Sequence, residues 1–137
     1  MQSKANWDKG LALAASGAGI VISIYLTVDH FVGVVPACPV SGPINCNVVL
    51  SSPYAVIAGS AIPTSAAGII WFTVSAGLWL TKLRSMQLAW AAAGLVTVIG
   101  LVFVEIVLLG AICLWCTAAH VLVLLIFVVA LMRWSAQ

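Results

Sequence analysis

The chain has 137 residues, of which 64% are hydrophobic and 6% are charged, and its net charge is +2. A soluble globular domain carries roughly 25% charged residues, so the composition excludes a soluble catalytic domain, a nucleic-acid-binding protein and a disulfide-rich secreted module. The three acidic and five basic residues leave uncharged stretches at 10–28, 30–81, 85–104 and 106–132. A helix crosses the hydrocarbon core with about 20 residues, so each stretch can span a bilayer at least once. The sequence therefore predicts a small all-α integral membrane protein.

Proline and glycine divide the longest uncharged stretch. Its first two thirds contain Pro36, Pro39, Pro43, Pro53 and Pro63, and helix-breaking residues at this density indicate a loop. We therefore expect a single membrane domain over residues 1–137, folded as a four-transmembrane-helix bundle with an outer loop. The expected helices cover about 11–34, 64–81, 87–110 and 112–132, and the loop covers about 35–63.

The basic residues predict the orientation in the membrane. With four spans, all five lie on one side: Lys4 and Lys9 precede the first span, Lys82 and Arg84 join the second to the third, and Arg133 follows the fourth. Segments rich in Lys and Arg stay in the cytoplasm, so both termini are expected there and the loop outside. A cleavable signal peptide is the alternative for the N-terminus, although its apolar region would exceed the roughly 7–15 residues usual for signals.

All four cysteines fall at the expected outer face. Cys38 and Cys46 form a C-x7-C pair in the loop, while Cys113 and Cys116 form a C-x-x-C pair where the fourth span begins. Residues at i and i+3 share a helix face, and the positive end of the helix dipole stabilises a thiolate, so this second pair is expected to be redox-active. Cys113 is expected to be more exposed than Cys116, which lies one turn deeper. The bacterial exterior is oxidising and favours disulfides.

Other interpretations remain open. Helix packing also explains Cys113 and Cys116, and a structural disulfide also explains Cys38 and Cys46. A zinc site is the third alternative, but the x7 spacing lies outside the usual C-x2-4-C pattern, so no metal is expected. Two further functions are a small proton-coupled transporter that uses Glu105, within the third span, and a structural subunit of a larger membrane complex.

Taken in order, these motifs resemble the vitamin K epoxide reductase family, and in particular its bacterial branch, from about Tyr25 to His120. The matching segments are the C-x7-C pair, Ser51-Ser52, Ile62-Pro63-Thr64-Ser65 and Gly110-Ala111-Ile112-Cys113-Leu114-Trp115-Cys116-Thr117-Ala118-Ala119-His120. The resemblance implies a helix bundle around a quinone and an active-site disulfide between Cys113 and Cys116, with Cys116 next to the quinone. It also implies that Cys38 and Cys46 shuttle electrons.

The resemblance implies a function as well. The protein is expected to be a thiol oxidoreductase of the bacterial plasma (inner) membrane that supports disulfide bond formation. Electrons are expected to pass from a reduced extracytoplasmic thioredoxin-fold protein, through the two cysteine pairs, to menaquinone or ubiquinone. Many bacterial relatives carry the partner as a fused domain, and this sequence ends at Gln137, so the partner is expected to act in trans. Membrane lipid is expected around the helices, and no nucleic acid is expected as a partner.

Three polar residues are expected at the quinone site from the same resemblance. Ser52 matches the loop serine of the family and precedes Pro53, which fits the N-cap of a short surface helix at about 53–60 that covers the bundle mouth. Thr64 stands where some relatives have a quinone-contacting asparagine. His120 stands where animal relatives have a tyrosine.

Glu105 and His120 are expected at nearly the same depth. Counted from the outer ends of their helices, they lie about 8 and 10 Å deep at 1.5 Å per residue. Ionisable groups inside a membrane are costly and usually have a partner or line a functional cavity. Beside a purely structural role, we expect His120 to donate a hydrogen bond to the quinone, with Glu105 fixing its tautomer or supplying protons. Asp29 and His30, near the outer end of the first span, are expected to be interfacial.

Overall fold

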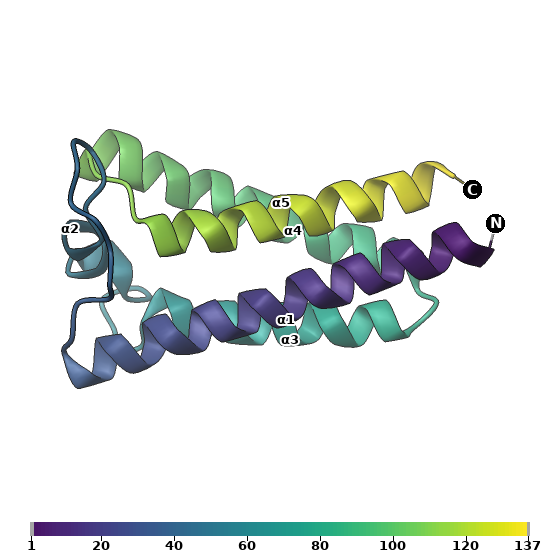
Figure 1. Cartoon of the computed structure of the whole chain (residues 1–137), viewed down its shortest axis with the longest axis horizontal. Coiled ribbons are helices and arrows are strands. Elements are labelled where there is room, and N and C mark those ends of the chain that lie inside the picture. The colour runs from purple at the N-terminus through teal and green to yellow at the C-terminus, as the bar shows by residue number, and fades with distance from the viewer. Residues whose placement is uncertain (1, 137) are drawn as a thin grey trace.

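The computed structural model describes residues 2–136, which form four long helices and three short helical segments (Figure 1). The long helices are α1 (Gln2–Val32), α3 (Thr64–Leu80), α4 (Arg84–Phe103) and α5 (Leu114–Ser135). α4 continues as a π-helical turn, η2 (Val104–Leu109), and the loop after α1 contains α2 (Cys46–Leu50) and the 3-10 turn η1 (Pro53–Ala55). α1 begins before the apolar stretch expected at about 11, because the polar residues that precede it continue the same helix.

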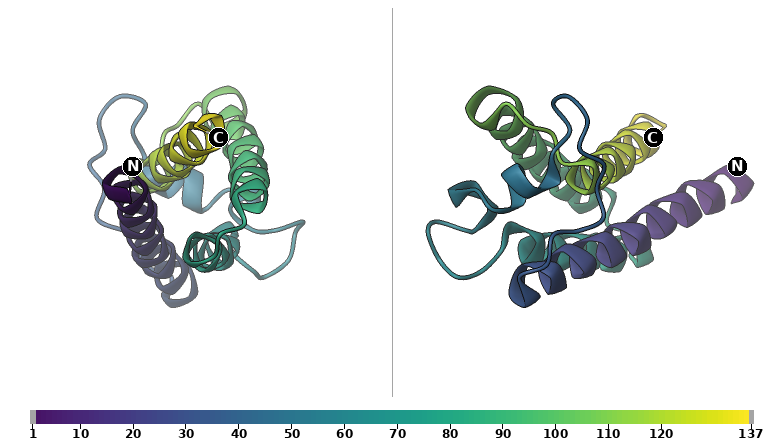
Figure 2. Two further views of the ribbon diagram at one scale, coloured as in Figure 1. Left: turned by 90° about the vertical axis from the view of Figure 1, so that its right-hand side faces the viewer. Right: turned by 60° about the vertical axis from the view of Figure 1, so that its left-hand side comes forward.

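The long helices form one bundle with the short elements at one end. α1 packs along α3 and α5, and α4 packs along α5, whereas α3 and α4 share a smaller interface. Figures 1 and 2 show the N- and C-termini together at one end of the bundle and α2 at the other. The loop between α1 and α3 therefore covers the end of the bundle that lies farthest from the termini.

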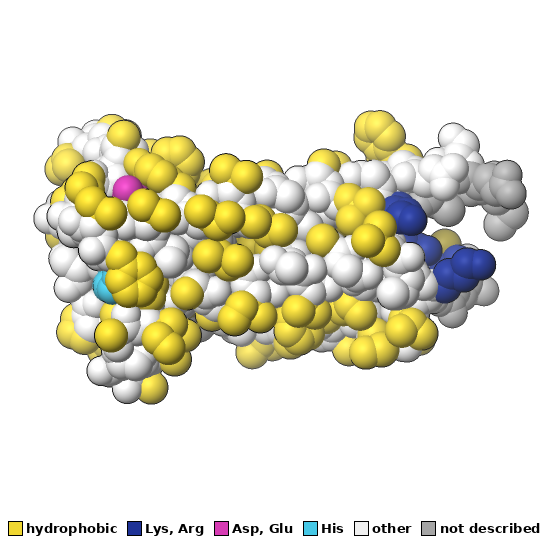
Figure 3. Space-filling model, turned by 90° about the horizontal axis from the view of Figure 1, so that it is seen from below, with side chains coloured by type: hydrophobic (Ala, Val, Ile, Leu, Met, Phe, Trp, Pro, Cys, Tyr) yellow, Lys and Arg dark blue, Asp and Glu magenta, His cyan; other side chains and the backbone are white. Residues whose placement is uncertain are grey.

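The surface of the bundle is apolar along its length. Large hydrophobic side chains such as Val21, Val96 and Ile99 are exposed on the helices, and Lys and Arg gather toward the end that carries the termini (Figure 3). Three segments are each long and apolar enough to cross a membrane: Asn6–Val32, Arg84–Leu109 and Leu114–Ser135. α3 is equally apolar but has only 17 residues. Helices with this surface indicate a membrane protein.

The packed core lies where α1, α3 and α5 meet. Phe72, Trp79 and Ile126 are almost fully buried there, beside the small side chain of Ala12. Gly19 allows α3 to approach α1, because a Cβ atom at this position would overlap the ring of Phe72. The core thus occupies the half of the bundle away from the cysteines and leaves the other half for a site.

The prediction of a short surface helix at about 53–60 is wrong. Only Pro53–Ala55 is helical, and Gly59 has a φ of +72°, which a right-handed helix does not contain. The chain instead turns back on itself after η1, so that the N–H of Ile57 donates to the carbonyl of Ile62 at 2.9 Å.

The short α-helix lies earlier in the loop because its cap lies there. The Oδ1 of Asn45 accepts a hydrogen bond from the N–H of Val48 (3.3 Å), which satisfies a free donor at the start of α2. Ser52 precedes η1 as expected for an N-cap position, but its hydroxyl donates to the carbonyl of Val49 in α2 (2.7 Å) and does not cap η1. Ser52 therefore closes the end of α2.

Candidate redox site

The C-x-x-C pair is positioned by an unusual helix end. α4 ends in the π-helical turn η2, and Gly110 follows with a φ of +61°, a conformation that suits glycine. The N–H of Ala111 donates to the carbonyl of Glu105 (3.0 Å). The side chain of Glu105 is buried, and its Oε2 accepts a hydrogen bond from the backbone N–H of Cys113 (3.2 Å). The end of α4 thus holds the residue at which α5 begins.

Cys113 and Cys116 are both free thiols, so the structure contains the reduced form of this pair. Cys113 is the N-cap of α5, and its Sγ accepts a hydrogen bond from the backbone N–H of Cys116 (3.2 Å). Hydrogen bonds from the side chain and then the backbone of Cys116 lower the pKa of the Cys113 thiol. Cys113 is therefore suited to react as a thiolate.

The expected order of exposure is wrong, because Cys113 is fully buried and Cys116 is partly exposed. The loop covers Cys113 through two backbone hydrogen bonds. The N–H of Ile112 donates to the carbonyl of Pro43 (2.8 Å), and the N–H of Asn45 donates to the carbonyl of Ile112 (3.0 Å). These bonds lay the loop across the start of the C-x-x-C motif.

The loop cysteines lie directly beside this motif. Cys38 and Cys46 form a disulfide, with their Cα atoms 6.1 Å apart. Cys46 is 1% exposed and belongs to a buried cluster with Val49, Ala111 and Cys113, while the half-buried Cys38 packs against that cluster. Within residues 2–136, no group of three or more His, Cys, Asp or Glu side chains is placed to hold a metal ion. The cysteines thus form two adjacent pairs.

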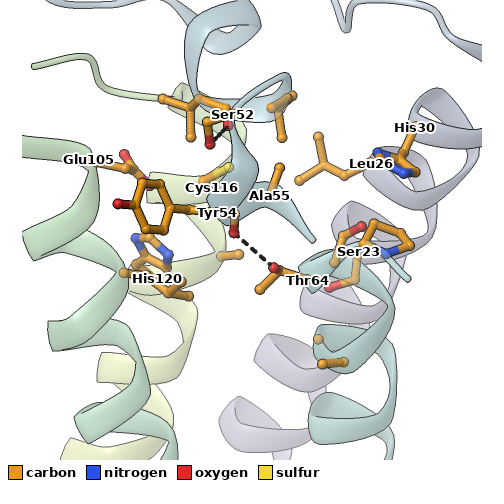
Figure 4. A pocket seen from close by; sticks show the side chains of 18 of the residues that line it. Ser23, Leu26, His30, Ser52, Tyr54, Ala55, Thr64, Glu105, Cys116 and His120 are labelled. Carbon is orange, nitrogen blue, oxygen red and sulfur yellow. Dashed lines mark hydrogen bonds between the residues drawn. The ribbon is translucent and has the colours of Figure 1, made fainter. Parts of the chain in front are cut away.

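A cavity of about 520 Å³ lies under α2 and η1, among residues of all four long helices. Most of its lining is apolar. Its polar lining includes Ser52, Tyr54, Thr64, Glu105, Cys116 and His120 (Figure 4). Among the described residues, Cys116 lines the cavity and Cys113 does not, so the two thiols face different surroundings.

The structure brings the polar residues expected at the quinone site to this one cavity, but two of them already donate to the backbone. The hydroxyl of Ser52 donates to the carbonyl of Val49, and the hydroxyl of Thr64 donates to the carbonyl of Tyr54 (3.3 Å; Figure 4). A hydroxyl has one donor and two acceptor positions, so both oxygens keep an acceptor position for another group.

Glu105 and His120 line the cavity together, but no hydrogen bond joins them in the described part of the chain. Glu105 contacts the backbone of Cys113 instead. Both side chains also line a second cavity of about 310 Å³ between α4 and α5, so they stand between the two cavities. The hydrogen bond through which Glu105 would fix the tautomer of His120 is therefore missing from this structure.

The sequence reasoning missed Tyr54 and set aside two other residues. Tyr54 lines the same cavity as His120, and its position within the expected surface helix was the only signal for it (Figure 4). Asp29 and His30, expected at the membrane interface, line the cavity as well. The Oδ2 of Asp29 is buried without a hydrogen-bond partner among residues 2–136.

The family model described as the vitamin K epoxide reductase family matches residues 11–131. This range contains both cysteine pairs and every residue that lines the larger cavity. No curated protein matches the chain.

Proposed function

The chain belongs to the vitamin K epoxide reductase family, which implies a membrane thiol-disulfide oxidoreductase, and we propose that it couples disulfide formation to quinone reduction. A reduced thioredoxin-fold protein outside the membrane gives two electrons to the loop pair. They pass to the C-x-x-C pair and then to the quinone. In the net reaction two partner thiols become one disulfide, and the quinone takes two electrons and two protons to become a quinol.

The observation that carries this proposal is the burial of Cys46 and Cys113 in one cluster while Cys116 lines the cavity. Thiol-disulfide exchange requires a thiolate to attack a disulfide sulfur. Once the loop pair is reduced, the Cys46 thiolate attacks Cys113 in the Cys113–Cys116 disulfide, and Cys116 leaves as a thiolate facing the cavity. Cys38 then attacks Cys46, which restores the loop disulfide and frees Cys113.

Exposure suggests which loop cysteine meets the partner. Cys46 is 1% exposed, whereas Cys38 is half-buried and so more accessible from outside. A partner thiolate therefore attacks Cys38 and forms the first mixed disulfide there. No Lys, Arg, Asp or Glu lies between His30 and Thr81, so the partner meets an uncharged surface at the loop.

The larger cavity suits a quinone ring as substrate. Its volume of about 520 Å³ falls within the range of roughly 300–1,000 Å³ typical of small-molecule sites, and such sites combine an apolar lining with a few polar groups. His120 donates a hydrogen bond to a quinone oxygen, and Ser52, Thr64 and Glu105 supply the remaining polar lining. The quinone is menaquinone or ubiquinone, the electron carriers of bacterial membranes.

The proposed topology has four spans in the bacterial plasma membrane, within one membrane domain. The 17 residues of α3 reach about 26 Å, close to the thickness of a hydrocarbon core. All Lys and Arg residues lie in the first turns of α1, where α3 is joined to α4, or in the last turn of α5, which favours cytoplasmic termini. The cysteines, at the other end of the bundle, then face the oxidising exterior.

The test uses the purified full chain in lipid nanodiscs with menaquinone or ubiquinone and a reduced thioredoxin-fold protein. We expect the quinone absorbance to fall as disulfide forms in the partner, and to stay constant with Cys116→Ala. If neither change occurred, and a chain without any cysteine retained proton-coupled transport, a transporter that uses Glu105 would be the better assignment.

A further inference from the structure

Glu105 is a buried acidic side chain in the apolar part of the chain. It is 6% exposed and lies in η2, the π-helical turn that ends α4. π-helical turns occur frequently at functional sites. An ionised carboxylate inside a membrane is costly unless a partner compensates it. Among residues 2–136, the hydrogen-bond partner of this side chain is the backbone N–H of Cys113. The exchange mechanism above makes no use of this group.

The hydrogen bond places the carboxyl group beside a second group that becomes an anion. The sulfur of Cys113 caps the same helix start, where it accepts the N–H of Cys116 (3.2 Å). A thiolate and a carboxylate here share the positive end of α5, and like charges repel strongly in a medium of low dielectric constant. We therefore expect only one of the two groups to be ionised at a time.

No fixed positive charge offsets this repulsion within the cavity. Its described lining contains no Lys or Arg. The titratable groups that line the cavity with Glu105 are Cys116 and His120 from α5, Tyr54 from η1, and Asp29 and His30 from α1. The proton on Glu105 is therefore linked most directly to the charge on the neighbouring sulfur.

The redox reaction needs such a proton. In the reduced state, a Cys113 thiolate, a Cys116 thiol and a protonated Glu105 together hold two protons and two transferable electrons. When the S–S bond forms, the thiol proton and the carboxyl proton go to the two quinone oxygens, the electron pair reduces the quinone, and Glu105 is left as the anion. Protons, electrons and charge balance without a further reactant.

We propose that Glu105 is a redox-linked proton carrier, protonated when Cys113 and Cys116 are reduced and ionised when they form a disulfide. This proposal rests on the proposed function only for the identity of the oxidant. The change in protonation itself depends on the redox state of the two cysteines, so it can be tested without a quinone.

Redox-difference infrared spectroscopy of the full chain in lipid nanodiscs tests the proposal. Glu105 is the only glutamate in the sequence, so glutamate labelled with ¹³C at the side-chain carboxyl assigns its signal directly. The measurement uses the Cys38→Ser, Cys46→Ser chain, in which Cys113 and Cys116 are the pair that changes state, with a phosphine as reductant and diamide as oxidant. We expect a protonated-carboxyl band in the reduced state, its loss on oxidation, and its shift with the label.

Variants separate this outcome from a merely structural role. Glu105→Gln keeps an oxygen that accepts the Cys113 N–H, yet it should lose the band completely, while Asp29→Asn, from the same cavity, should keep it. In the otherwise native chain, Glu105→Gln should slow oxidation of the C-x-x-C pair by quinone about 100-fold. The proposal would be overturned if the Cys38→Ser, Cys46→Ser chain with Glu105 in place showed no protonated-carboxyl band. It would also be overturned if that band did not respond to redox state or did not shift with labelled glutamate. Failure of the native chain to reduce quinone would contradict the proposed function alone, because the infrared measurement contains no quinone.

Discussion

The indole N–H of Trp115 donates a hydrogen bond to the carbonyl of Ala37 at 2.9 Å, which ties the centre of the C-x-x-C motif to the residue before Cys38. Tyr25 completes this contact. Its ring meets the Trp115 ring edge-on with centroids 5.0 Å apart, and its hydroxyl accepts the N–H of Ala37 (3.2 Å). Trp115 therefore does more than separate two cysteines, because it helps to hold the loop disulfide over the C-x-x-C pair.

Trp115→Phe should loosen this contact without unfolding the bundle. Phenylalanine retains an aromatic ring against Tyr25 but has no N–H, and a lost hydrogen bond costs about 0.5–1.5 kcal/mol. We expect the amides around Ala37 and Cys38 to exchange with deuterium up to about tenfold faster, and turnover with a protein donor to fall. Tyr25→Phe, which removes the other bond to Ala37, is the matched variant. Unchanged exchange in both variants would show that other contacts hold the loop.

The cysteine pairs should respond differently to two donors. Cys116→Ala is expected to abolish quinone reduction with every thiol donor, because no disulfide can form beside the cavity. Cys38→Ala and Cys46→Ala should keep most activity with a small dithiol, which can reach Cys113 once the loop disulfide is gone, and lose it with a thioredoxin-fold donor. Quinone absorbance is the measurement. Equal loss with both donors would make Cys38 and Cys46 a structural disulfide.

An all-helical membrane protein was predictable from the sequence because the charged residues mark where helices leave the membrane. The family was predictable from the order and spacing of the cysteine motifs. The burial of Cys113 was not, because it depends on backbone hydrogen bonds from Ile112 to Pro43 and from Asn45 to Ile112, which no side-chain pattern encodes. The position of the short helix was missed for a related reason. Ser52-Pro53 resembles a helix start, but Asn45 caps a helix earlier in the loop.

The cavity was harder to predict than the cysteines. Tyr54 lines it from η1 and Asp29 from the end of α1, and the position of these two elements relative to each other depends on tertiary contacts. The partner of Glu105 was also missed, because a depth estimate along ideal helices does not foresee the π-helical turn that directs its side chain to the N–H of Cys113.

Gly94 should control the depth of the cavity. A Cβ atom there would lie 2.6 Å from Cε2 of Trp71, so Gly94→Ala must push this indole, which lines the cavity. We expect the KM for quinone to rise by about tenfold, because the displaced indole of Trp71 changes the shape of the cavity. Gly100→Ala, on the same helix with nothing within 4 Å, is the control and should leave the KM unchanged. An identical KM in all three chains would show that the quinone does not reach Trp71.

The proposed orientation, together with the exposure of the two loop cysteines, predicts which thiol a membrane-impermeant reagent labels first. After mild reduction of intact cells, a membrane-impermeant maleimide should label Cys38 faster than Cys46, because Cys46 is 1% exposed. Single-cysteine chains carrying one or the other thiol allow the two rates to be compared by mass shift. Labelling that requires an opened cytoplasm would reverse the orientation, and faster labelling of Cys46 would reverse the order of electron entry.

His120 should act on the quinone and not on the disulfide. It lines the cavity with Cys116 and has no hydrogen-bond partner within residues 2–136, so its ring nitrogens are available to a ligand. His120→Ala should raise the KM for quinone or slow turnover by about tenfold, the effect of about 1.4 kcal/mol. Chemical oxidation should still form the Cys113–Cys116 disulfide, which mass spectrometry after alkylation measures. His120→Gln keeps a side-chain N–H donor and should recover part of the loss. Native quinone kinetics in His120→Ala, at a normal protein level, would make His120 a packing residue between the two cavities.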